Sequence, residues 1–424
     1  MSTHRHPLLA SMGPGLLMAG AAVGVSHLVQ ATRAGGEYGL ALLALVLLAC
    51  ALKYPFLEFG PRYAAATGES LIRGYRRLGD WALGLFSLIT LGTMLIIQAS
   101  VTLVTAGLLG LVFDLDLTMT QLSFLVLVGC IVILAIGRYH GLDLVMKLIM
   151  AALGISTLAA VSLAFGSEPD WGALSPLANW DQIWTAAGFA FLLALLGWMP
   201  IPLDVAAWHS LYTLERARQT GHQPSVRHAL IDFRIGYIGA TVLAGLFVLL
   251  GALVMYGSGE RFPEGAVAFS GALVELYAAS LGEWSRPIIA VAALTAMFST
   301  TLAVTDAYPR VIRELLEISG VGQEDEQLPN LHRGRYVTGL LLVTIGAMII
   351  IHYFGQRFTL LIDVATTVSF LAAPLLAWLN IRLLTSEHTP VEHRPGRGLL
   401  SLAWAGFAFL VVFSLIWLSW RLIA

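Results

Sequence analysis

Three of the ionisable side chains inside apolar stretches of this 424-residue sequence are its main candidates for chemistry. His27 ends a Gly-Val-Ser-His run in the first stretch, Asp204 follows two prolines in a later one, and Asp363 lies in a third. A charged side chain inside a bilayer is costly unless it is paired or hydrated. Such residues therefore indicate a site for an ion or a polar substrate.

Each of these residues also has a plainer interpretation, and the sequence leaves both open. Asp204 suits the beginning of a helix, where a carboxylate satisfies free N–H groups and the positive end of the dipole. Asp363 is near Arg357, which could neutralise it. A lone buried His is often only a hydrogen-bonded core residue, although imidazole also suits a proton relay.

The remaining polar residues exclude several classes of protein. There is no nucleophile–base pair, phosphate-binding loop or zinc-ligand spacing, so we expect neither an enzyme nor a cofactor. The net charge of −2 gives no basic surface for nucleic acid. Cys50 and Cys130 lie in apolar runs and are expected to be small core residues.

The composition places these residues in a membrane. Hydrophobic residues make up 58% of the chain and charged residues 12%, against about 25% charged in soluble domains. The apolar runs recur at about the length of a bilayer-spanning helix, and they are continuous rather than alternating. We predict one membrane domain, 1–424, with eleven helices at about 8–31, 39–60, 81–113, 120–137, 143–165, 183–212, 230–257, 286–310, 334–353, 358–384 and 397–422.

Basic residues predict the orientation of these spans. With the N-terminus in the cytoplasm, 18 of the 24 lysines and arginines fall in cytoplasmic connections and five, including Arg33 and Arg357, fall outside. Lys53 lies within the second span. Since positive residues favour the cytoplasmic side, we expect a bacterial inner-membrane protein with its C-terminus outside.

Helix breakers occur at corresponding places in the first and sixth predicted spans. The first contains Gly24 near its middle, and the sixth contains Pro200 and Pro202 two residues apart, so we predict unwound backbone near 24–27 and near 198–203. Proline removes a backbone donor, and irregular backbone at membrane depth survives only where protein buries it or it lines a cavity. Matched breaks predict two inverted five-helix repeats, about 8–165 and 183–384, with a substrate site between the breaks and an extra helix at 397–422. Two simple proline kinks are the alternative.

At these positions the sequence resembles the NRAMP divalent metal-ion transporters. The resemblance rests on the run from Gly13-Pro14-Gly15 to Gly39, on Gly60-Pro61-Arg62 with Thr67-Gly68, and on Met199-Pro200 with the later His209-Ser210. It implies an all-α LeuT-type fold and proton-coupled import of a divalent metal by alternating access.

The resemblance fails at the residues that the family uses for metal. The family's Asp-Pro-Gly-Asn motif falls on Gly24, Val25, Ser26 and His27, and the histidine of its Met-Pro-His motif falls on Ile201. The third helix offers Gln98, Ser100 and Thr102 in place of the family's acids. Its metal chemistry and its proton route are therefore both expected to differ here.

We expect a secondary transporter with a remodelled site that does not favour manganese or iron. The candidate substrate-binding residues are Gly24, Ser26, His27, Met199, Asp204 and Asp363. Among them His27, Asp204 and Asp363 are candidate metal ligands, and His27 is also the candidate proton relay. The alternatives are a carrier of a small organic or anionic solute, which the N-termini of broken helices suit, and a non-transporting regulator. The sequence does not predict an oligomeric state.

Overall fold

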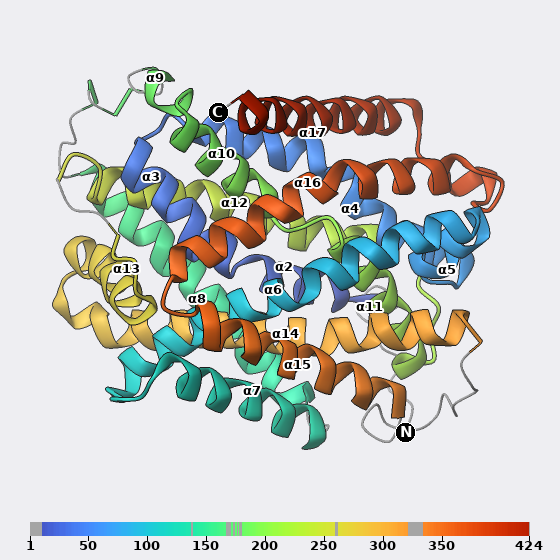
Figure 1. Cartoon of the computed structure of the whole chain (residues 1–424), viewed down its shortest axis with the longest axis horizontal. Coiled ribbons are helices and arrows are strands. Elements are labelled where there is room, and N and C mark those ends of the chain that lie inside the picture. Colours follow the sequence, from blue (N-terminus) through green and yellow to red (C-terminus); the bar gives the residue numbers. More distant parts are fainter. Residues whose placement is uncertain are drawn as a thin grey trace.

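Long apolar helices lie side by side along the long axis of the molecule in the computed structural model (Figure 1). The structure describes residues 11–136, 139–166, 171–172, 174–175, 177, 180–258, 262–320 and 334–423, without the side chains of 136–150, 421 and 423. The beginning of the first predicted span and parts of the connection 166–182 lie outside these residues.

The described helices begin and end as follows. They are α2 (Pro14–Ala22), η1 (Val25–Ala31), α3 (Thr32–Tyr38), α4 (Leu43–Thr67), α5 (Leu71–Leu78), α6 (Asp80–Phe113), α7 (Met119–Ile136), α8 (Tyr139–Phe165), α9 (Trp180–Ile183), α10 (Ala186–Trp198), α11 (Val205–Thr220), α12 (Val226–Val254), α13 (Ala266–Leu281), η2 (Glu283–Ser285), α14 (Arg286–Ile318), α15 (Gly334–Phe354), α16 (Phe358–Thr385), η4 (Val391–His393) and α17 (Arg397–Ile423).

This arrangement fits the predicted eleven spans. Eight helices within the described ranges are long and apolar enough to cross a membrane, counting Pro14–Tyr38 as one. The shorter helices α7 and α8 and the broken pair α10–α11 supply the others. Two described helices of eight or more residues fall outside the predicted spans: α5, and α13, whose 16 residues lie in an expected connection. They lie at opposite ends of the bundle (Figure 1).

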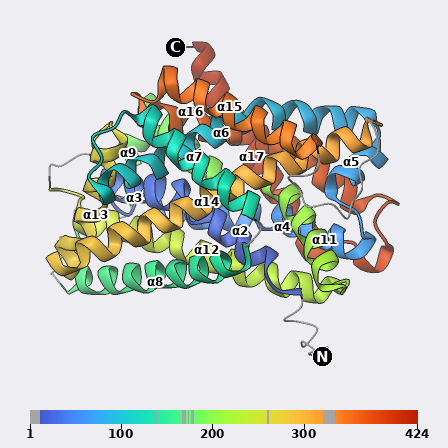
Figure 2. The ribbon, with the colours of Figure 1, turned by 90° about the horizontal axis from the view of Figure 1, so that it is seen from below.

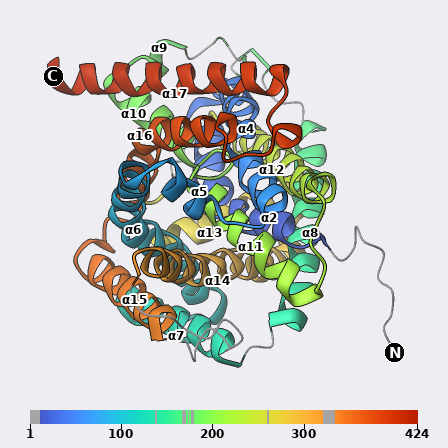
Figure 3. The same ribbon diagram turned by 90° about the vertical axis from the view of Figure 1, so that its right-hand side faces the viewer.

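The two broken spans lie in the interior of the bundle. Viewed along the helices, α2 and α11 are near the middle, with α17 on one flank and α7 and α15 on the other (Figure 3). The last helix, α17, packs against α4, α10 and α16. On the other side α14 contacts α6, α7, α8 and α15 (Figure 2). The broken spans are thus enclosed by continuous helices.

Polar side chains along these helices join them in pairs. Arg62 pairs with Glu58 at 2.5 Å and Arg310 pairs with Asp306 at 2.8 Å, as their i,i+4 spacing predicts. Thr301 Oγ1 donates to Val101 O at 3.1 Å and so joins α14 to α6. The threonines of α14 therefore hold helices together, as such residues often do in membrane proteins.

Candidate substrate site at the helix breaks

The sixth span is interrupted between Trp198, where α10 ends, and Val205, where α11 begins. Pro200 has no N–H group, so it leaves the carbonyl of Leu196 without its intrahelical partner four residues on. Gly197 allows α10 to pass close to α16, because a Cβ there would lie 2.0 Å from Thr366 O. The predicted break near 198–203 is confirmed.

The first span is interrupted at Val23 and Gly24, between α2 and the wide π-type turns of η1. We predicted unwinding over 24–27, and the observed break begins one residue earlier and is shorter, since Val25 already belongs to η1. Gly24 is required by close packing: a Cβ there would lie 2.7 Å from Thr300 Oγ1 and 2.8 Å from its Cγ2.

The two breaks face each other. Ser26 Oγ lies 3.3 Å from Pro200 O and 2.6 Å from Ala22 O, so it can donate to either carbonyl. Beside this contact is a cavity of about 20 Å³, roughly the room that one water molecule needs. Its lining is Ala21, Val25, Ser26, Ile97, Val101, Trp198, Ile201, Pro202, Val205, Trp208, Thr300 and Val304.

His27 is directed away from this cavity and toward α12. Its Nε2 lies 2.8 Å from Ala240 O, and its Nδ1 lies 2.8 Å from Ser26 Oγ. Since a carbonyl only accepts, Nε2 carries the hydrogen and donates it. In the neutral ring Nδ1 is then an acceptor, so it competes with the Ala22 and Pro200 carbonyls for the one hydrogen of the Ser26 hydroxyl. The imidazole does not line the cavity.

Asp204 occupies the N-cap position of α11, as one interpretation predicted, but its side chain makes no capping hydrogen bond. It is 5% exposed, and its Oδ2 accepts from the Tyr308 hydroxyl at 3.1 Å. The carboxylate therefore lies at the positive end of α11, where a negative charge is favoured.

Asp363 is neutralised by a different arginine from the expected one. Its Oδ1 lies 2.8 Å from Arg33 Nη1 and 3.0 Å from Gln30 Nε2. Arg33 was assigned to an outer connection because its span was predicted to end at 31. The first span instead continues through α3 to Tyr38, and Arg33 is 8% exposed and contacts the Phe191 ring. The pair joins the first span to the tenth.

The six candidate residues are not assembled into one site in this conformation. Ser26 lines the cavity and Gly24 adjoins it, whereas Met199 is fully buried and is not among the lining residues. His27, Asp204 and Asp363 each bond to different partners. The described residues contain no group of three or more His, Cys, Asp or Glu side chains that could hold a metal ion.

Lys53, to which the sequence analysis gave no role, reaches the break from α4. It is fully buried, and its Nζ donates to Leu196 O at 3.2 Å and to Gly197 O at 3.0 Å. These are carbonyls of the last turn of α10, where a positive charge is favoured. The signal was available, since an intramembrane lysine indicates function.

Trp208 was also missed. Its side chain lines the cavity and is 4% exposed, and its ring packs edge-on against Tyr308 with centroids 4.8 Å apart. The indole Nε1 has no hydrogen-bond partner. An unsatisfied buried donor is unusual in proteins. No residue spacing in the sequence marks this tryptophan.

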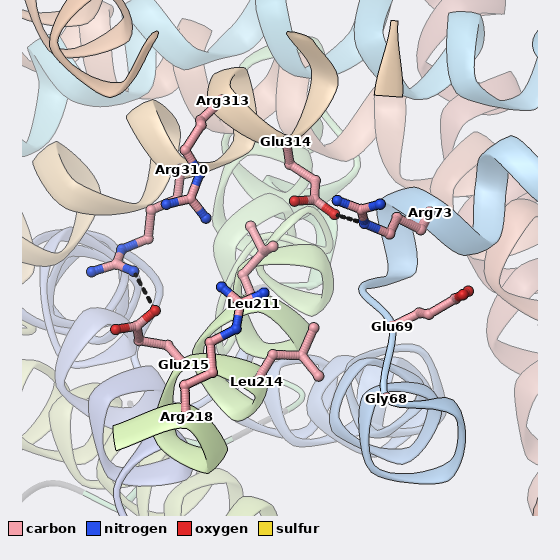
Figure 4. A pocket seen from close by; sticks show the side chains of 10 residues that line it. All are labelled: Gly68, Glu69, Arg73, Leu211, Leu214, Glu215, Arg218, Arg310, Arg313 and Glu314. Carbon is pink, nitrogen blue, oxygen red and sulfur yellow. Dashed lines mark hydrogen bonds and ion pairs between the residues drawn. The ribbon is translucent and has the colours of Figure 1, made fainter. Parts of the chain in front are cut away.

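A second, larger pocket of about 210 Å³ lies at the end of the bundle where α5 is found. Charged residues of α11 and α14 line it, and Arg310 lies 3.5 Å from Glu215 across it (Figure 4). Arg73 binds Glu314 at 2.7 Å on its other side. The helices α11 and α14 therefore line both this pocket and the central cavity.

The broken, facing first and sixth spans within an all-helical bundle define a secondary carrier of the LeuT type. Solved structures share this fold. A manganese transporter mutant from Eremococcus coleocola superposes with a TM-score of 0.73 at 16% identity, over 96% of this chain and 86% of that one. MhsT in complex with L-phenylalanine gives 0.65 at 13% identity, over 97% of this chain and 99% of that one.

The sequence comparisons identify the family. The model for natural resistance-associated macrophage protein-like (Nramp) proteins matches residues 15–419, so the chain belongs to this family of transporters and is an integral membrane protein. An uncharacterized protein from Pasteurella multocida is 34% identical over 98% of this chain and 93% of its own length. The divalent metal cation transporter MntH from Brucella suis is 22% identical, over 86% and 78%.

Proposed function

We propose that this protein is a secondary transporter that works by alternating access, and that its remodelled central site does not favour manganese or iron. The observation that carries the proposal is the contact between the two breaks, where Ser26 meets Pro200 beside the cavity. Broken helices at membrane depth are the usual place for a substrate in such carriers. The two repeats, the cytoplasmic N-terminus and the inner-membrane location are part of this proposal.

A divalent cation is the first candidate substrate, supported by relatives whose names describe divalent metal cation transport. Its proposed donors are His27, Asp204 and Asp363, with His27 as the proton relay. Oxygen donors with few soft ones suit a harder, more hydrated ion than manganese. In this conformation each donor is engaged elsewhere, so a cation would need both breaks to rearrange.

A small organic or anionic solute is the second candidate. The cavity lining supports it, because Ser26 and Thr300 are its polar residues apart from the two tryptophans, and it contains no carboxylate. Helix N-termini at the breaks suit anions.

Thiol labelling tests alternating access without requiring the substrate. Val25→Cys, which places a thiol at the cavity, is made after replacing Cys50 and Cys130 by Ala. Membrane-impermeant thiol reagents are then added to either side of sealed vesicles. We expect labelling from both sides, in proportions that shift with the conformational equilibrium. The lipid-facing Ile155→Cys, at a position 69% exposed, is the unreactive control. Labelling from one side only under all conditions would contradict the proposal.

A further inference from the structure

The carbonyls at the end of α10 already bind the amino group of a lysine. Lys53 is fully buried on α4 and donates to the carbonyls of Leu196 and Gly197, at 3.2 and 3.0 Å. Pro200 deprives Leu196 O of its helical partner, so the ammonium supplies what the helix lacks. In carriers with broken helices, the carbonyls at such a half-helix C-terminus are the groups that coordinate a bound cation.

We infer that Lys53 is a tethered cation that takes this place and thereby restricts the central site to small solutes without positive charge. The inference rests on the proposed function and narrows its substrate class to anions and neutral molecules that carry a hydrogen-bond acceptor. A metal ion at the same carbonyls would have to displace the ammonium and would meet its repulsion in a poorly hydrated site. Asp204, at the start of α11, accepts from the Tyr308 hydroxyl at 3.1 Å, so its Oδ2 is already engaged within the protein.

The cavity supplies an independent observation that indicates an acceptor. Trp208 lines it at 4% exposure, and its Nε1–H has no partner. The other lining tryptophan, Trp198, is already satisfied, since it donates to Ser369 Oγ at 2.8 Å. A buried N–H without a partner gains one hydrogen bond when an acceptor oxygen comes within reach, whereas a metal ion gains nothing from it.

Three probes of one shape separate charge from size. Acetate, acetamide and acetamidinium have the same heavy-atom skeleton and carry a negative, zero and positive charge. Isothermal titration on the purified protein in detergent measures the affinity for each probe and, in parallel, for Mg²⁺ and Mn²⁺. We expect acetate and acetamide to bind, and acetamidinium and both metals to bind at least about tenfold more weakly.

Lys53→Gln tests the residue itself, because the amide can still donate to the α10 carbonyls while the charge is lost. It should shift the acetate-to-acetamidinium affinity ratio by at least about tenfold toward the cation. Arg382→Gln removes the same charge at an exposed position on α16 and should leave the ratio unchanged. Trp208→Phe keeps the packing on Tyr308 and should lower the affinity for acetate and for acetamide by about threefold to tenfold.

Several results would overturn the inference. Wild-type protein that binds acetamidinium, Mg²⁺ or Mn²⁺ as tightly as acetate contradicts it, as does a ratio unaffected by Lys53→Gln in a variant that elutes as one symmetric peak. Failure of both acetate and acetamide to bind the wild type also contradicts it. The thiol-labelling assay distinguishes failure of the proposed function from failure of this inference. Labelling from one side only rejects the transporter. Labelling from both sides, together with a preference for the cationic probes, rejects only the role of Lys53.

Discussion

At Gly24, where the sequence interpretation expects the family's metal-binding carboxylate to be replaced, we predict that no side chain fits without displacing its neighbours. A Cβ at Gly24 would lie 2.7 and 2.8 Å from the Oγ1 and Cγ2 atoms of Thr300 on α14. Forcing such a contact typically costs about 1–3 kcal/mol, because neighbouring helices must move apart. Gly24→Ala should lower the free energy of unfolding by about this amount, measured by equilibrium unfolding in mixed SDS micelles.

A double-mutant cycle identifies the contact responsible. Thr300→Ala removes the two nearest atoms, so the Gly24→Ala, Thr300→Ala double variant should be at least about 1 kcal/mol more stable than the sum of the single effects. Alone, Thr300→Ala loses the 2.9 Å hydrogen bond to Gly20 O, which is worth about 0.5–1.5 kcal/mol. Gly20→Ala is the control, since its nearest neighbour is Ser299 Oγ at an ordinary 3.6 Å. The reasoning would be refuted if the changes in the free energy of unfolding were additive, or if Gly24→Ala destabilised the protein no more than Gly20→Ala.

Three further predictions concern coupling, gating and metal transport. Gln98 bonds to Thr102 and Thr305 at 3.1 and 3.0 Å. Since amides and hydroxyls do not exchange protons near neutral pH, proton coupling through α6 should be weak or absent when substrate-driven acidification of proteoliposomes is measured; strong coupling that is lost only on changing α6 residues would contradict this. Arg33→Gln removes the ion pair to Asp363 and should speed thiol labelling at Val25→Cys from the side of the membrane where α3 ends, whereas Arg357→Gln should not. Equal labelling rates in the two variants would reject the ion pair as a contact that closes this side. Gly24→Asp with His27→Asn should not create strong manganese uptake into proteoliposomes, because the Thr300 clash remains; robust uptake would show that the rest of the site is intact.

The breaks could be predicted from the sequence because proline and glycine act locally. Pro200 and Pro202 remove backbone donors whatever surrounds them, and α10 ends at Trp198 as expected. The first break was placed less exactly, since Gly24 is required by contact with Thr300, more than 270 residues away in the chain. Such a contact leaves no local pattern.

The partners of the candidate residues could not be predicted for the same reason. Arg33 and Asp363 lie on spans one and ten, and only the fold brings them to 2.8 Å. An error of seven residues at the end of the first span had placed Arg33 in a connection. The direction of His27 toward Ala240 likewise follows from the π-type turns of η1, which the sequence did not indicate. Lys53, by contrast, was visible as an unpaired intramembrane charge.

Manganese binding to the unmodified protein tests the central claim most directly. Loss of one charged ligand from such a site costs several kcal/mol, which corresponds to roughly a hundredfold or more in affinity. Isothermal titration should therefore give no saturable binding of Mn²⁺ at micromolar concentrations, and proteoliposomes should show no appreciable uptake. Micromolar affinity would contradict the account and would mean that a replacement carboxylate had been recruited, which Asp204→Asn and Asp363→Asn would then identify.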